Sequence, residues 1–99
     1  MQGQPFILRE DGGSYATLVE PRTDAGEIFE TRTQYTAYRG VLCRHWIVDW
    51  QGSKFDEVSG GLRSRGGTIP VKDGADIAKI IQREAIGRYG YRLPIREMP

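Results

Sequence analysis

The stretch from residue 26 to residue 52, GEIFETRTQYTAYRGVLCRHWIVDWQG, constrains the fold more than any other part of the chain. It is rich in Thr, Tyr, Val and Trp, which favour strands, and its apolar residues recur with a period of two. Arg39-Gly40 in its middle predicts a two-residue turn, because glycine readily adopts a positive φ. The stretch is therefore predicted to form an antiparallel hairpin.

This turn fixes which residues of the hairpin face each other. The more apolar face is predicted to point into the core. Its cross-strand pairs are Phe29 with Trp50, Thr31 with Val48, Thr33 with Trp46, Tyr35 with Arg44, and Ala37 with Leu42. The other face sets Glu30 against Asp49, which is unfavourable because the charges are alike. A bulge or a longer loop would relieve that contact.

Three further segments have the composition of strands. PFILRED and SYATLVEP flank DGGS, and together they predict an N-terminal hairpin over residues 1–21, ended by Pro21 and followed by the loop RTDAG. KFDEV is predicted to be the third strand of the main sheet and TIPVK the fourth. Pro70 lacks an N–H and suits an edge strand.

Residues 73–89 are the only convincing helix. Asp73 is the predicted N-cap and Gly90 the predicted stop. An apolar stripe runs along one side and is formed by Ile77, Ile80, Ile81, Ala85 and Tyr89. The last residues, 90–99, contain two prolines and are expected to run extended.

These elements predict one α+β domain over residues 1–99. An N-terminal β-hairpin (1–21) precedes a curved four-stranded antiparallel sheet (26–72). A single C-terminal helix (73–89) covers one face of that sheet, giving the order ββββα, and a tail (90–99) follows.

Composition limits the class of protein. No run of about 18 apolar residues exists, so no membrane span is expected, and the first residues lack the pattern of a secretory signal. One cysteine, Cys43, cannot form an internal disulfide, so we expect a cytoplasmic protein. The formal net charge of +1 hides an acidic start before residue 32 and a basic stretch over 32–72, which can attract a polyanion.

Catalytic chemistry is not expected. Cys43 and His45 lie two apart on a strand and face the same way, as a nucleophile and its base would. No second His or further Cys completes such a site or a structural zinc site. No phosphate-binding glycine motif or hydrolase motif appears. We therefore expect no enzyme activity, no cofactor and no metal.

The basic middle of the chain interleaves aromatic and positively charged side chains, the combination that holds single-stranded nucleic acid by stacking and phosphate contacts. A structural reading competes with this one, since Phe29, Trp46 and Trp50 at a period of two are typical of a core. Tyr35, Tyr38 and Phe55 are freer to be exposed. The candidate contacts are Arg39, Arg44, Lys54, Tyr35, Tyr38 and Phe55.

The segment SGGLRSRGG, residues 59–67, adds Arg63 and Arg65 to these candidates. Its glycines give reach and its arginines give charge. It is either a basic loop that holds an anion or an ordinary connection between two strands.

Residues 26–86 resemble one repeat of the Pur-alpha family, within the wider group of Whirly-type single-stranded nucleic-acid-binding folds. The matching segments are GEIFE, HWIVDWQG, KFDEV, SGGLRSRGG, TIPVK and DIAKIIQREAI. The resemblance implies binding of single-stranded DNA or RNA on the sheet and its loops. It also implies a homodimer, in which Ile86, off the apolar stripe, would contact the partner. The extra N-terminal hairpin and the low net charge depart from the family pattern.

Two functions follow as hypotheses. The first is a module that binds single-stranded nucleic acid. The alternative is a small protein-interaction or inhibitor module, of the kind encoded by phages or mobile elements, acting on a host protein or nucleoprotein. Free edge strands at PFIL or TIPV would then add to a partner's sheet.

Overall fold

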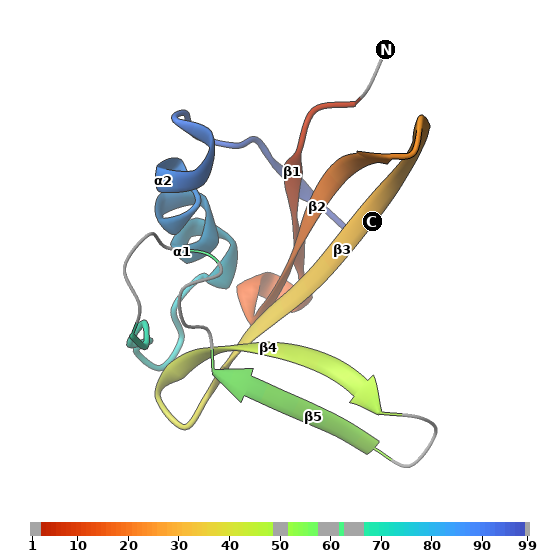
Figure 1. Cartoon of the computed structure of the whole chain (residues 1–99). Coiled ribbons are helices and arrows are strands. Elements are labelled where there is room, and N and C mark those ends of the chain that lie inside the picture. Colours follow the sequence, from red (N-terminus) through yellow and green to blue (C-terminus); the bar gives the residue numbers. More distant parts are fainter. Residues whose placement is uncertain (1–2, 49–51, 58–61, 63–66, 99) are drawn as a thin grey trace.

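The computed structural model describes residues 3–48, 52–57, 62 and 67–98, and it shows an α+β fold (Figure 1). Among the described residues the sheet has six strands in the order β5-β4-β3-β2-β1-β6. Neighbours from β5 to β1 are antiparallel, whereas β6 is parallel to β1. The elements are β1 (Phe6–Glu10), a 3-10 turn (Asp11–Gly13), β2 (Tyr15–Asp24), β3 (Glu27–Tyr38), β4 (Val41–Val48), β5 (Gly52–Glu57), α1 (Ile77–Glu84), α2 (Ile86–Tyr89) and β6 (Ile95–Glu97).

The N-terminal hairpin forms, but it is not a separate unit. β2 pairs with β1 on one side and, along its full length to Asp24, with β3 on the other. The predicted end at Pro21 and the predicted loop after it are therefore wrong, and strands β1 and β2 belong to the sheet rather than extending its edge. The turn that joins β2 to β3 is Ala25-Gly26, and both residues have a positive φ, 52° and 84°.

Pro21 is tolerated inside β2 because of its place in the ladder. It pairs with Glu30, and counting outward from the turn pair Asp24–Glu27 makes this a pair that exchanges no hydrogen bonds. The proline nitrogen therefore points away from β3, toward the side of β1. The pairing of β1 with β2 reaches only as far as Phe6 opposite Val19, so β1 does not extend to Pro21. A missing N–H removes no ladder bond there.

The predicted hairpin around Arg39-Gly40 is confirmed near its turn. Gln34–Tyr38 pair with Val41–His45 in the predicted register, and the two turn residues have φ values of 53° and 79°. Beyond Gln34 the predicted pairs of Thr33 with Trp46 and of Thr31 with Val48 do not form. β4 turns away from β3 and continues with β5 at a steep angle to the rest of the sheet (Figure 1). The expected Glu30–Asp49 contact falls partly outside the described residues.

The third and fourth predicted strands differ in outcome. KFDEV lies largely within β5, which pairs with β4. TIPVK makes only an isolated bridge, Val41 with Pro70, supported by hydrogen bonds from Leu42 N to Ile69 O (2.8 Å) and from Val71 N to Gly40 O (2.9 Å). Val41 and Pro70 themselves exchange no hydrogen bonds, so the missing N–H of Pro70 removes none from this bridge.

The C-terminal helix is shorter than predicted and is interrupted. α1 begins after Asp76, whose side chain accepts a hydrogen bond from Ala78 N (3.1 Å), so Asp76 and not Asp73 is the N-cap. Gly74 has a φ of 76°, which keeps the preceding residues out of the helix. A break at Ala85 separates α1 from α2, and Gly90 ends α2 in the left-handed conformation as predicted.

The core lies between the helices and one face of the sheet (Figure 1). Ile77, Ile80, Ile81 and Ala85 are buried in it, and Tyr89 packs against it, which confirms the predicted stripe. The sheet contributes Ile7, Leu18, Tyr35 and Leu42, and other segments contribute Leu62, Ile69, Val71 and Leu93.

Neither of the described helices is long and apolar enough to cross a membrane.

Candidate anion-binding cavity

Tyr35 and Arg44, two predicted contacts, are cross-strand neighbours on the face that the helices cover. Arg44 is exposed, but the side chain of Tyr35 is only 4% exposed. The expectation that Tyr35 is free to stack a base is therefore wrong. Period two places it on the same face as Leu42 and Leu18, and α1 closes over that end of β3.

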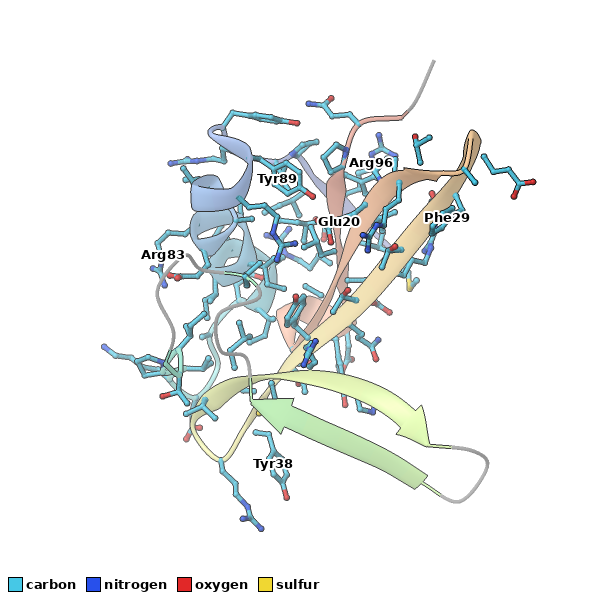
Figure 2. All side chains as sticks on the ribbon, in the orientation of Figure 1. Glu20, Phe29, Tyr38, Arg83, Tyr89 and Arg96 are labelled. Atoms are coloured by element: carbon cyan, nitrogen blue, oxygen red, sulfur yellow. The ribbon has the colours of Figure 1, made fainter. Side chains whose placement is uncertain are left out.

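The second pair of predicted contacts lies at the C-terminal end of β3 and in the turn that follows it. Tyr38 is 40% exposed, as expected, and the Arg39 guanidinium lies 5.1 Å from the centre of its ring. Figure 2 shows Tyr38 at the β3–β4 turn, far from the helices. Tyr38 follows Tyr35 by three residues and lies on the opposite face of β3, so the two do not share one binding surface.

The remaining predicted contacts are less fully described. Lys54 and Phe55 lie in β5, opposite Trp46 and His45 in the ladder, and their side chains lie outside the described part of the chain. Arg63 and Arg65 are also outside the described residues. Leu62, which precedes them, is 2% exposed and belongs to the core.

Phe29 and Ile86 are both exposed. Phe29, expected in the core, is 47% exposed, because it lies near the tip of the β2–β3 hairpin, beyond the helices (Figure 2). Ile86, the predicted dimer contact, is 36% exposed at the start of α2.

A cavity of about 500 Å³ lies between α2 and strands β2, β3 and β4. It collects side chains from both ends of the chain. Strand β2 contributes Glu20 and Arg22, and β3 contributes the hydroxyl-bearing side chains at alternate positions. The described residues that line it are Glu20, Pro21, Arg22, Thr31, Thr33, Tyr35, Arg44, Leu62, Arg88 and Tyr89.

Glu20 is the centre of the polar contacts in this cavity. Its Oε2 accepts a hydrogen bond from Arg88 Nη1 at 2.8 Å and another from the Tyr89 hydroxyl. Figure 2 shows Glu20 and Tyr89 pointing toward each other across the space between β2 and α2. One carboxylate on the sheet thereby holds two donors of the short helix α2.

Burial and charge shift the acidity of the two cavity tyrosines. Burial raises the pKa of Tyr89 to about 12, and the Glu20 carboxylate adds to the effect. Burial also raises the pKa of Tyr35, which the positive charge of Arg88 partly opposes. Both phenols are thus protonated donors at neutral pH, not nucleophiles.

The described lining of the cavity carries a positive formal charge. It contains three arginines and one glutamate, which sum to +2. Arg22 makes no ion pair with any residue in the described ranges, and Arg88 keeps 32% of its side chain exposed. Guanidinium groups with neighbouring hydroxyls are the donors that proteins use to bind phosphate. The cavity is therefore a candidate site for an anionic ligand.

Sequence reasoning missed Glu20, Arg22, Arg88 and Tyr89 as site residues. One signal was present: Glu20 and Arg22 share the strand face of the buried Leu18. A charged residue on an inward-facing position of a strand is uncommon unless it is paired or functional. Its helix partners could not be found without the tertiary structure.

Cys43 and His45 do share one face of β4, as predicted. Cys43 is buried, with Sγ 3.9 Å from the Tyr38 carbonyl oxygen. His45 Nδ1 lies 2.6 Å from Gln34 Oε1, and its ring centre lies 5.6 Å from that of Tyr15. The imidazole is thus oriented by Gln34 and Tyr15. Within the described ranges no group of three or more His, Cys, Asp or Glu residues could hold a metal ion.

Comparison with known proteins gives no match: neither a protein family, nor a curated protein, nor a solved structure is similar enough to the chain. The resemblance to a Pur-alpha repeat stays a prediction from the sequence.

Proposed function

We propose that this chain binds single-stranded nucleic acid and that the cavity beside α2 receives one of its phosphate groups. The observation that carries the proposal is the convergence of Arg22, Arg44 and Arg88 from three different elements on one cavity. Nucleic acid is the anion that the basic middle of the chain also attracts, since its phosphates repeat along the strand.

The cavity changes the set of proposed contacts. Arg44 remains, and Arg22 and Arg88 join it. Tyr35 is buried at the floor of the cavity, so only its hydroxyl group is proposed to contact the ligand. Tyr89, which is half-buried, replaces Tyr35 as the aromatic side chain proposed to lie beside the nucleotide. Tyr38 with Arg39 forms a second proposed contact, at the β3–β4 turn, where a longer strand could stack. Four further contacts are proposed from the sequence alone: Lys54, Phe55, Arg63 and Arg65.

The test is a fluorescence-anisotropy titration with short single-stranded DNA and RNA at about 50 mM salt. Arg22→Gln and Arg44→Gln should each weaken binding about tenfold, the size expected for losing a charge-assisted hydrogen bond. Arg83→Gln removes the same charge from α1, on a side chain that does not line the cavity, and should change affinity little. Absence of binding by the unmodified protein would end the proposal.

One observation favours the alternative, a protein-interaction or inhibitor module. The expected edge strand PFIL is not an edge, because β1 lies between β2 and β6. The short strand β6 is instead an edge strand of the described sheet, and a strand of a partner protein could pair with its outer edge. A pull-down from lysate with and without nuclease separates the two functions. Recovery of one protein that survives nuclease favours this alternative, and loss on nuclease favours nucleic-acid binding.

A further inference from the structure

The inner end of the cavity is closed by core residues. Tyr35 and Leu62 line it, and both belong to the hydrophobic core, with exposed fractions of 4% and 2%. These two residues form a floor of packed side chains among the described lining residues. The end of a strand that enters can place its phosphate against this floor.

The charge of the cavity also distinguishes a strand end from its interior. An internal phosphodiester carries one negative charge, whereas a terminal phosphomonoester carries about −1.5 to −2 and exposes three acceptor oxygens. The charged residues of the described lining, three arginines and Glu20, sum to +2 and match the second group. The lining arginines come from β2, β4 and α2, and guanidinium groups donate to phosphate oxygens in charge-assisted hydrogen bonds.

Glu20 contributes by holding two donors of the cavity. It fixes Arg88 and Tyr89 through hydrogen bonds to one oxygen, so both donors are in place before a ligand arrives.

We propose that the cavity binds the terminal phosphate of a single strand in preference to internal phosphodiesters. This inference rests on the proposed nucleic-acid function. The volume of about 500 Å³ is in the range of small-molecule sites and leaves room for the nucleotide that carries the phosphate. Thr31 and Thr33, which line the β3 side, provide hydroxyl groups for its sugar.

The test compares oligothymidines of about ten nucleotides that differ only at one end. In the first pair the 5′ end carries either a phosphate or a hydroxyl group, and the dye is at the 3′ end. In the second pair the 3′ end carries the phosphate or the hydroxyl group, and the dye is at the 5′ end. We expect one phosphorylated end to bind about tenfold more tightly than its hydroxyl counterpart. Arg44→Gln should remove this preference, and Arg83→Gln should keep it.

The outcomes separate this inference from the proposed function. Equal affinity for phosphate and hydroxyl ends, with Arg44→Gln weakening both alike, overturns end recognition and leaves nucleic-acid binding standing. If no oligonucleotide binds but thymidine monophosphate raises the melting temperature of the protein and not of Arg44→Gln, the phosphate site stands and nucleic-acid binding fails. If neither ligand has any effect, both proposals fail.

Discussion

Arg9 on β1 and Asp76 at the start of α1 form a two-point ion pair. Arg9 Nε donates to Asp76 Oδ1 at 3.2 Å, and Nη2 donates to Oδ2 at 2.7 Å. The same carboxylate caps α1 through Ala78 N, and Arg9 also contacts Glu97 on β6. Three side chains, Arg9, Asp76 and Glu97, thus join the first strand, the helix and the last strand.

Asp76→Ala should therefore destabilise the fold. The change removes the cap, at a cost of about 1 kcal/mol, and the ion pair, worth up to about 1 kcal/mol more at this partly exposed site. Urea unfolding followed by circular dichroism measures the loss. Asp73→Ala, at the exposed residue that the sequence suggested as the cap, is the control and should change stability by less than about 0.5 kcal/mol. A larger loss from Asp73→Ala would contradict the assignment.

Acid stability should depend on the same carboxyl. Burial by itself raises the pKa of Asp76, but the hydrogen bonds and charge of Arg9 outweigh burial, so the pKa lies below the ordinary value of 3.8. A lowered folded-state pKa adds stability that is complete above the unfolded value and is lost as pH falls through the folded value. We expect Asp76→Asn to show a weaker fall in melting temperature below about pH 4 than the unmodified protein. Parallel curves for the two proteins would refute this.

Tyr89 should ionise unusually late in an alkaline titration. Burial and the Glu20 carboxylate raise its pKa to about 12, so its hydrogen bond stabilises the fold below the ordinary value of 10.0 and is lost as pH rises toward 12. Ultraviolet absorbance of the tyrosinate follows the ionisation. Glu20→Gln removes the negative charge and should bring one tyrosine back toward the ordinary range. Tyr89→Phe identifies which tyrosine moved, and an unchanged curve for Glu20→Gln would show that Glu20 does not control it.

A substitution at Ala25, in the turn between β2 and β3, should increase the free energy of unfolding. Ala25 holds a φ of 52°, a conformation that asparagine adopts more readily than alanine. Ala25→Asn should raise the unfolding free energy by about 0.5–1 kcal/mol, and Ala25→Val should lower it, since β-branched residues resist a positive φ. Thermal unfolding of both variants gives the comparison. A stabilising Ala25→Val would contradict the turn geometry.

The proposed homodimer can be tested at Ile86. This side chain is 36% exposed on α2, and Tyr91, 42% exposed, follows the helix. Ile86→Lys places a charge on that surface and should convert a dimer to a monomer, halving the mass measured by light scattering. Circular dichroism checks that the variant is folded. A monomeric unmodified protein, or a dimer that survives the change, would remove Ile86 from the interface.

Local features of the sequence predicted much of the fold. The Arg39-Gly40 turn and the pairing of Tyr35 with Arg44 followed from a two-residue turn and a period of two, both of which act between near neighbours. The apolar stripe of the helix and the stop at Gly90 followed in the same way. The helix start was predicted three residues early, because Asp73 and Asp76 are equally suitable caps and Gly74 decides between them through its φ.

The place of the N-terminal hairpin was decided only by the tertiary structure. Pro21 suggests a strand end when read alone, and it is harmless only because β1 stops before it. The candidate cavity has the same origin. Period two places Glu20 on the strand face of Leu18 and Arg44 on that of Leu42, but the two faces join only through the pairing of β2 with β3. Arg88 and Tyr89 reach Glu20 only because α2 packs over β2. Sequence patterns predict contacts within a turn, a strand pair or a helix. Which distant elements meet depends on the packing of the whole chain, and that packing forms the cavity.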